Sequence, residues 1–83
     1  MSPDEILKQV KECVLDIAPE ADFGRLHPSR PWRDQLDIDS FDFLNILTGI
    51  HRRLGVDIPE ADYQKVATLN ALVDYLSGKR GAQ

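Results

Sequence analysis

The sequence Leu36-Asp37-Ile38-Asp39-Ser40-Phe41-Asp42 marks the point where an irregular part of this chain passes into an amphipathic helix. Asp39 has the short acceptor side chain of a helix N-cap, so Ser40 falls in the first turn of that helix. The first turn presents unpaired backbone N–H groups and the positive end of the helix dipole. A phosphate attached to the hydroxyl of Ser40 is therefore expected to be well placed.

The helix that follows is predicted over Ser40 to Leu54 and has two sets of apolar side chains. One set recurs at helical spacing and is expected to face the core: Phe43, Ile46, Leu47, Ile50 and Leu54. The other set lies on a different face and has no obvious partner in so small a domain: Phe41, Leu44 and Thr48. Two interpretations stay open for this second set, a docking surface for a partner or an extension of the core.

Helices are also predicted on both sides of this one. Ser2, Pro3 and Glu5 form a capping box with proline at the first helical position, and an apolar stripe continues to Ala18-Pro19: Ile6, Leu7, Val10, Cys13, Val14 and Ile17. A short third helix is expected from Pro59 to about Val66. Thr68 is expected to cap a last helix with its own stripe, which Gly78 ends: Leu69, Leu72, Val73 and Leu76.

Between the first and second of these helices the chain is rich in proline and has no sustained hydrophobic period. It is interpreted as a loop of about twenty residues, unusually long for a compact domain. Four side chains are candidates for anchoring it to the core: Phe23, Leu26, Trp32 and Leu36. The predicted fold is all-α, a four-helix bundle with a long first loop and a short third helix, with residues 1–78 as one domain and residues 79–83 as a disordered tail.

Composition narrows the possible functions. A formal charge of −4 over 83 residues argues against nucleic acid as a partner, because phosphate binding needs a basic surface. No apolar run approaches the roughly 20 residues of a membrane span, and no signal-peptide pattern is present, so a cytoplasmic location is expected. Cys13 is the single cysteine and is expected to be a buried apolar residue. His27 and His51 stand apart from each other and from carboxylates at ligand spacing, so no metal site is predicted.

At Asp39-Ser40-Phe41 the chain resembles the acyl carrier protein family, whose Asp-Ser-Leu motif carries a phosphopantetheine arm on its serine. The resemblance continues through Gly55-Val56-Asp57-Ile58-Pro59, which is similar to the connector after the family's second helix. It also includes Ala67-Thr68-Leu69 and Val73-Asp74-Tyr75-Leu76, which look like the family's last helix. Roughly residues 3–77 fit the pattern, and several motifs in the right order are more specific than one tripeptide.

The resemblance implies that a phosphopantetheinyl transferase moves 4'-phosphopantetheine from coenzyme A to Ser40. The thiol at the end of this arm then carries an acyl or aminoacyl group as a thioester. Asp39 would help the transferase recognise the motif, and Phe41 would lie beside the arm in place of the usual leucine or methionine. The chain itself would not be an enzyme and would contain no catalytic residue.

The resemblance also suggests which residues meet partner enzymes, namely a loading ligase and downstream transferases or synthases acting on a monomeric carrier. The expected partner surface comprises Asp42, Leu44, Asn45, Thr48, Arg52 and Ile58. Asn45 replaces a frequent glutamate of the family, His51-Arg52-Arg53 replaces an acidic run, and Asp37 replaces a frequent glycine. Since surface charge sets encounter rate and partner choice, a specialised lipid, polyketide or secondary-metabolite pathway is predicted rather than housekeeping fatty-acid synthesis.

Three alternatives remain open at this point. The chain could be an aminoacyl or peptidyl carrier, since these cargoes share one arm. It could also keep the carrier fold without modification and bind a partner helix through Phe41, Leu44 and Thr48. A small hydrolase or transferase acting through Ser40 is disfavoured, because no histidine or lysine is arranged to activate the hydroxyl.

Overall fold

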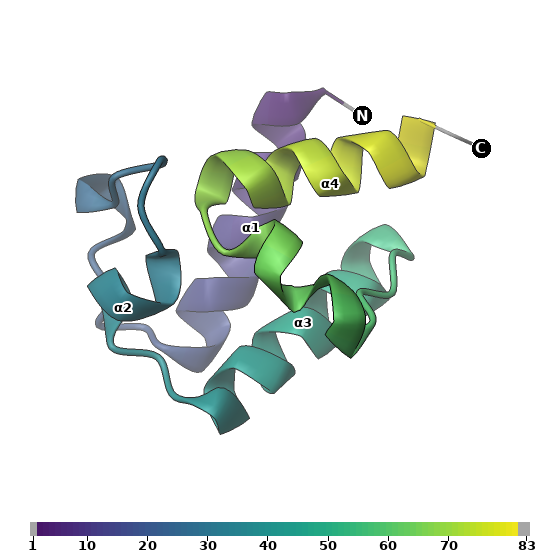
Figure 1. The fold of residues 1–83 in the computed structure, drawn as a ribbon. Helices are drawn as coiled ribbons and strands as arrows, with labels where there is room; N and C mark the ends of the chain where they lie inside the picture. Colours follow the sequence, from purple (N-terminus) through teal and green to yellow (C-terminus); the bar gives the residue numbers. More distant parts are fainter. Residues whose placement is uncertain (1, 82–83) are drawn as a thin grey trace.

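A computed structural model describes residues 2–81, and its helices form a bundle in which segments distant in sequence lie side by side (Figure 1). The elements in chain order are α1 (Pro3–Ile17), η1 (Phe23–Arg25), α2 (Trp32–Leu36), α3 (Ser40–Leu54), η2 (Glu60–Val66) and α4 (Leu69–Gly81). Helix α1 packs against both α3 and α4, and the 3₁₀ helix η2 packs against α4. The predicted all-α bundle with a long first loop and a short third helix is confirmed.

The core consists of the apolar stripes of these helices. From α3 the structure buries the whole predicted set: Phe43, Ile46, Leu47, Ile50 and Leu54. From α1 it buries Ile6, Val10, Cys13 and Val14, with Leu7 and Ile17 packed at the margin. From α4 it buries Leu69, Leu72 and Leu76. Helical periodicity therefore predicted correctly which side of each main helix faces inward.

Side-chain caps fix the starts of the three long helices. The hydroxyl of Ser2 accepts a hydrogen bond from the N–H of Glu5 at 3.3 Å, and the hydroxyl of Thr68 accepts from Ala71 at 3.1 Å. The carboxylate of Asp39 accepts from the N–H of Asp42 at 2.8 Å, which starts α3 at Ser40. Each bond satisfies one donor that the first helical turn leaves unpaired.

The C-terminal ends were predicted less well. Gly55 ends α3 in the left-handed conformation with φ of 71°, as expected of a C-cap glycine. Gly78 does not end α4, which continues to Gly81, so the expected helix end is wrong. One glycine inside a helix costs only about 1 kcal/mol relative to alanine and does not by itself terminate it. The expected disordered tail is therefore helical through 81, and 82–83 lie outside the described residues.

The long first loop contains a helix that the sequence analysis missed. Helix α2 is only five residues long, and its Trp32 is 1% exposed. The indole Nε1–H of Trp32 donates to the carbonyl of Val66 at 2.8 Å, and the backbone N–H of Trp32 donates to the carbonyl of Ala67 at 3.1 Å. Phe23, Leu26 and Leu36 are partly buried against the core, as predicted for the anchoring side chains.

The end of α2 positions the start of α3. The N–H groups of Asp37 and Ile38 both donate to the carbonyl of Arg33, the second of them at 3.0 Å. Asp37 adopts the left-handed conformation with φ of 54°, which asparagine and aspartate tolerate better than most other residues. Ile38 is then buried, and Asp39 and Ser40 follow directly. This turn leaves little freedom in how Ser40 sits relative to α2.

A hydrogen bond between α4 and η2 joins the two C-terminal helices. The hydroxyl of Tyr75 donates to the carboxylate of Asp62 at 2.6 Å, and Lys65 pairs with the same carboxylate at 3.3 Å. The Tyr75 hydroxyl, followed by Lys65, lowers the pKa of Asp62. The bond to Asp62, together with burial, raises the pKa of Tyr75 from 10.0 to about 12.

These pKa shifts predict a pH dependence of stability. Between pH 10 and pH 12 the unfolded chain loses the Tyr75 proton while the folded chain keeps it, so stability should fall as pH rises through this window. The lowered pKa of Asp62 should likewise cost stability as pH falls below 3.8. Urea unfolding of the wild type and Tyr75→Phe, followed by circular dichroism, measures both effects. The wild-type advantage should be largest near neutral pH and should shrink above pH 10; parallel pH profiles would contradict the assignment.

Candidate functional site

Ser40 is an exposed residue at the first position of α3. The backbone carbonyl of Asp39 accepts from the N–H of Phe43 at 2.9 Å, while its side chain caps Asp42. Asp39 and Asp42 therefore both lie within one helical turn of Ser40. The sequence prediction that Ser40 sits in the first turn of a helix, behind an Asp39 cap, is confirmed.

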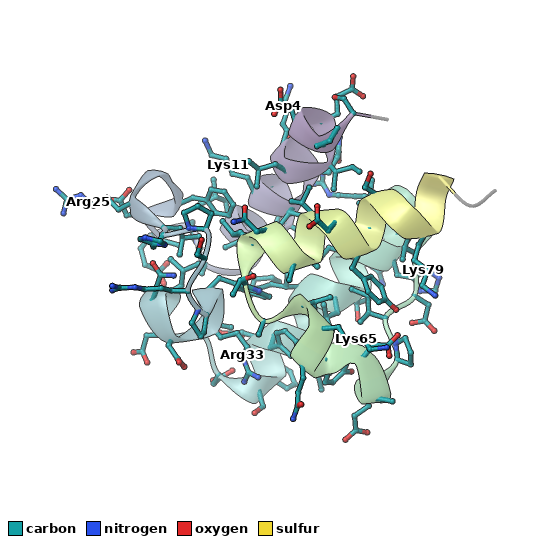
Figure 2. The ribbon with its side chains drawn as sticks, turned by 45° about the horizontal axis from the view of Figure 1, so that its top comes forward. Asp4, Lys11, Arg25, Arg33, Lys65 and Lys79 are labelled. Carbon is teal, nitrogen blue, oxygen red and sulfur yellow. The ribbon has the colours of Figure 1, made fainter. Side chains whose placement is uncertain are left out.

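One cation lies beside the serine, and the sequence analysis did not single it out. The Nη2 of Arg33, from α2, is 3.5 Å from the Oγ of Ser40, at the long limit of a hydrogen bond. The guanidinium carbon of Arg33 lies 4.3 Å from the ring centroid of Phe43, in cation–π contact. The Nε of Arg33 is buried without a hydrogen-bond partner. In Figure 2, Arg33 lies at the end of the molecule where α2 leads into α3.

An aromatic cluster of Trp32, Phe43 and Tyr63 packs against the first turns of α3 on the core side. The ring of Phe43 lies 5.5 Å from that of Trp32 and 5.2 Å from that of Tyr63, the latter edge to face. A cavity of about 340 Å³ opens next to this cluster, lined by Arg33, Ser40, Phe43, Leu44, Glu60 and Tyr63. A second cavity of about 390 Å³ shares Arg33, Phe43 and Tyr63 with it. The Ser40 hydroxyl therefore lies at the edge of a partly apolar cavity that is also lined by the guanidinium of Arg33.

Exposed apolar side chains flank the serine. Phe41 is 73% exposed and Leu44 is 47% exposed, which makes them the large apolar side chains that the described part of the chain leaves in solvent. Thr48 is exposed on the same face, and its hydroxyl donates to the carbonyl of Leu44 at 2.9 Å. The structure thus removes the interpretation that Phe41 and Leu44 extend the core.

The remaining residues of the expected partner surface lie in three different places. Asn45, Thr48 and Arg52 gather around a cavity of about 280 Å³ between α3 and α1. Asp42 lies beside Ser40 in the first turn of α3. Ile58 is a correction: it is 6% exposed and belongs to the core, so its side chain is not part of this surface. The apolar Val56 and Ile58 of the connector point inward because they close the core between α3 and η2.

The two arginines at the end of α3 have different surroundings. Arg53 reaches α1, where it pairs with Glu12 at 2.6 Å and Asp16 at 3.0 Å. It also donates to the side chain of Gln9 at 3.2 Å. Arg52 is exposed and lines the small cavity with Asn45. Arg53 therefore joins α3 to α1, and of the two arginines it is Arg52 that remains for a partner.

Other residues with reactive side chains lie away from Ser40. Cys13 is buried, burial raises the pKa of its thiol, and its Sγ lies against Gly49, as expected of an apolar core residue. His27 and His51 are exposed. Among residues 2–81 no group of three or more histidine, cysteine or acidic side chains is placed to hold a metal ion. No described helix combines the length and apolar character needed to span a bilayer.

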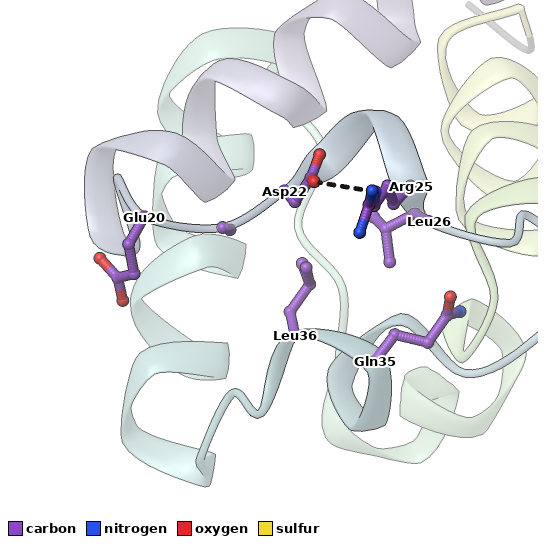
Figure 3. Close-up of a pocket in the computed structure, with 7 residues that line it drawn as sticks. Glu20, Asp22, Arg25, Leu26, Gln35 and Leu36 are labelled. Carbon is purple, nitrogen blue, oxygen red and sulfur yellow. Dashed lines mark ion pairs between the residues drawn. The ribbon is translucent and has the colours of Figure 1, made fainter.

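Ser40 does not line the most spacious cavity that we describe. It measures about 520 Å³ and is lined by Glu20, Ala21, Asp22, Arg25, Leu26, Gln35 and Leu36 (Figure 3). Asp22 and Arg25 form an exposed ion pair of 3.4 Å at its rim. None of the predicted site residues lines this cavity, so size alone does not identify the functional site.

Comparisons with known proteins show which family this chain is similar to. Residues 8–76 match the family model described as a phosphopantetheine attachment site. An acyl carrier protein of Rubrobacter xylanophilus is 28% identical over 76 residues, covering 92% of this chain and 93% of the relative. One of Thermosynechococcus vestitus is 28% identical over 85 residues, covering 99% and 100%. One of Micrococcus luteus is 30% identical over 77 residues, covering 93% and 94%.

The contrast between Arg52 and Arg53 generates a prediction. Arg53→Glu places a third acid beside Glu12 and Asp16 and should lower the urea midpoint, whereas Arg52→Glu, the matched control one residue away, should change it little. The difference should shrink near 1 M salt, where the screening length is about 3 Å. Equal midpoints for both variants at low salt would mean that the Arg53 pairs contribute nothing.

Proposed function

The chain belongs to the acyl carrier protein family, and on this basis we propose that Ser40 carries its phosphopantetheine arm and that the protein serves a specialised lipid, polyketide or secondary-metabolite pathway. Proteins of this family are carriers and not enzymes. Their covalently bound cofactor is 4'-phosphopantetheine, and their partners are a phosphopantetheinyl transferase and enzymes that handle acyl groups. The cargo travels as a thioester on the arm.

The exposure of Ser40 at the start of α3 is the observation that carries the proposal. A transferase needs a hydroxyl that it can reach, with space for the pyrophosphate of coenzyme A. In the transfer, the oxygen of Ser40 forms a new bond to phosphorus, its proton is released, and adenosine bisphosphate leaves. The transferase supplies the activation, so this chain needs only to present the hydroxyl, with Asp39 as a recognition residue and Phe41 beside the arm.

The charge of the exposed face of α3 supports a specialised pathway. In the fifteen residues of α3 the one acid is Asp42. Further along the helix Thr48 and Arg52 are exposed and Asn45 is partly exposed. A carrier for basic enzyme surfaces benefits from several carboxylates there, because complementary charge speeds encounter and rejects wrong partners. We therefore assign this carrier partners whose contact surfaces are less basic, reached through Leu44, Asn45, Thr48 and Arg52.

An aminoacyl or peptidyl cargo is compatible with the same arm. The exposed Phe41 and Leu44 favour one second candidate, a carrier fold that binds its partner without modification.

We propose the cytoplasm as the location and a monomer as the working form, as the family resemblance implies.

Intact-mass measurement tests the attachment site. Purified protein incubated with coenzyme A, magnesium and a broad-specificity phosphopantetheinyl transferase should gain the mass of one arm. Ser40→Ala should gain none, because the accepting oxygen is gone. Ser77→Ala, which removes a hydroxyl from α4 and leaves Ser40 in place, is the matched control and should be modified like the wild type. A folded, initially unmodified protein that gains no mass would favour the unmodified interaction module.

A charge change on α3 tests the specialised assignment. Asn45→Glu combined with Arg52→Glu makes the exposed face acidic and should slow loading by the native ligase while improving recognition by fatty-acid enzymes. Loading rates are measured at low salt, where such charge effects are largest. Arg25→Glu, which alters an exposed loop remote from Ser40, is the control. Identical loading rates for the wild type, the double variant and Arg25→Glu would contradict the proposal that the charge of α3 selects the partner.

A further inference from the structure

We infer that Arg33 binds the phosphate of the arm attached to Ser40 and so fixes the direction in which the arm leaves the protein. The inference rests on the proposed attachment at Ser40 and adds a positioning residue from a different helix. Its basis is the 3.5 Å separation between the Nη2 of Arg33 and the Oγ of Ser40. When Oγ becomes the bridging oxygen of a phosphodiester, the two non-bridging oxygens on phosphorus share one negative charge. They lie two bonds from Oγ, within reach of the same guanidinium.

Arg33 is short of partners within the described residues. Four ion pairs are formed among the residues that the structure describes, and Arg33 takes part in none of them. Its Nε is buried and unpaired, and its contact with Ser40 is long and made to a neutral hydroxyl. A partly buried guanidinium is costly without an anion nearby, and its planar set of donors matches two oxygens of a phosphate. Since none of the described carboxylates forms an ion pair with Arg33, a phosphate attached at Ser40 would be its first directly bound anion.

Two negative charges next to Ser40 mean that a phosphate attached there would be stabilised by a nearby cation. Asp39 and Asp42 place two carboxylates within one turn of Ser40, and the Asp39 side chain already uses the N–H of Asp42. One backbone N–H at the start of α3 is therefore unavailable to a phosphodiester, so the helix dipole and free N–H groups stabilise it less than they would at an uncapped helix. The negative charges of the two aspartates also repel it. Arg33 supplies a positive charge on the side facing α2 and offsets this repulsion.

The position of Arg33 is fixed from two directions. Its carbonyl accepts the N–H groups of Asp37 and Ile38, which ties its backbone to the turn before α3. Its side chain stacks on Phe43, whose ring is itself held between Trp32 and Tyr63. A phosphate bound by Arg33 would be drawn toward the cavity lined by Leu44, Glu60 and Tyr63. The arm would then start along the groove between α3 and η2, away from the Asn45 and Arg52 cavity.

The test compares the protein before and after loading, with intact mass recorded on the same samples. In ¹⁵N-labelled wild type, the Nε–H resonance of Arg33 should shift when the arm is added, because a charged acceptor replaces a hydroxyl beside its guanidinium. The resonance of Arg30, an exposed arginine three residues away, should not shift. This comparison needs no substitution, so it holds even where a variant folds poorly.

Variants give a second readout. The ³¹P resonance of loaded Arg33→Gln should move away from that of the wild type, and Arg30→Gln should match the wild type. Arg33→Lys keeps the charge but loses the planar donors and should lie between them. If mass is gained but neither the Arg33 nor the ³¹P resonance responds, this inference fails and attachment at Ser40 stands. If no mass is gained, attachment fails and this inference falls with it.

Discussion

The hydrogen bond from the buried indole of Trp32 to the carbonyl of Val66 is the constraint on which the functional end of this carrier depends. It joins the long first loop to the end of η2, and the backbone bond from Trp32 to Ala67 lies beside it. Because both partners are shielded from water, loss of the donor would leave a buried carbonyl unsatisfied. These two bonds of Trp32 attach the loop to the bundle where α2 starts. The turn at the end of α2 then leads directly into the Asp39 cap and Ser40.

The sequence predicted the parts of the fold whose stability has local causes. Ser2, Asp39 and Thr68 were identified as caps because a cap needs only a short acceptor and the next three residues. The stripes of α1, α3 and α4 were identified because helical spacing sets one face apart. Helix α2 could not be found in this way, because five residues offer no period and Pro31 precedes them. Its stability comes from Trp32, whose partner is 34 residues away in sequence.

In the candidate site too, residues adjacent in sequence could be identified, and a residue brought in by the fold could not. Ser40, Asp39 and Phe41 could be proposed from the sequence because they are contiguous and resemble a family motif. Arg33 was missed, since its contact with Ser40 depends on the left-handed turn at Asp37 that brings the end of α2 back to α3. The signal available in sequence was a cation seven residues before the serine and next to an anchoring tryptophan. Ile58 was misassigned because a connector next to a predicted partner surface need not face outward.

Helix α3 presents an inward and an outward face with different side chains, because neighbouring residues on a helix point about 100° apart. Phe43 turns into the aromatic cluster, while Leu44, the next residue, is left half-exposed near Ser40. Ten residues later the same separation sends Arg53 to the acids of α1 and leaves Arg52 in solvent. Changes at the outward positions can therefore alter partner choice while the inward positions keep the bundle intact. A family that shares one arm and one fold can in this way serve enzymes with different surfaces, because the outward side chains of α3 can change without disturbing the core.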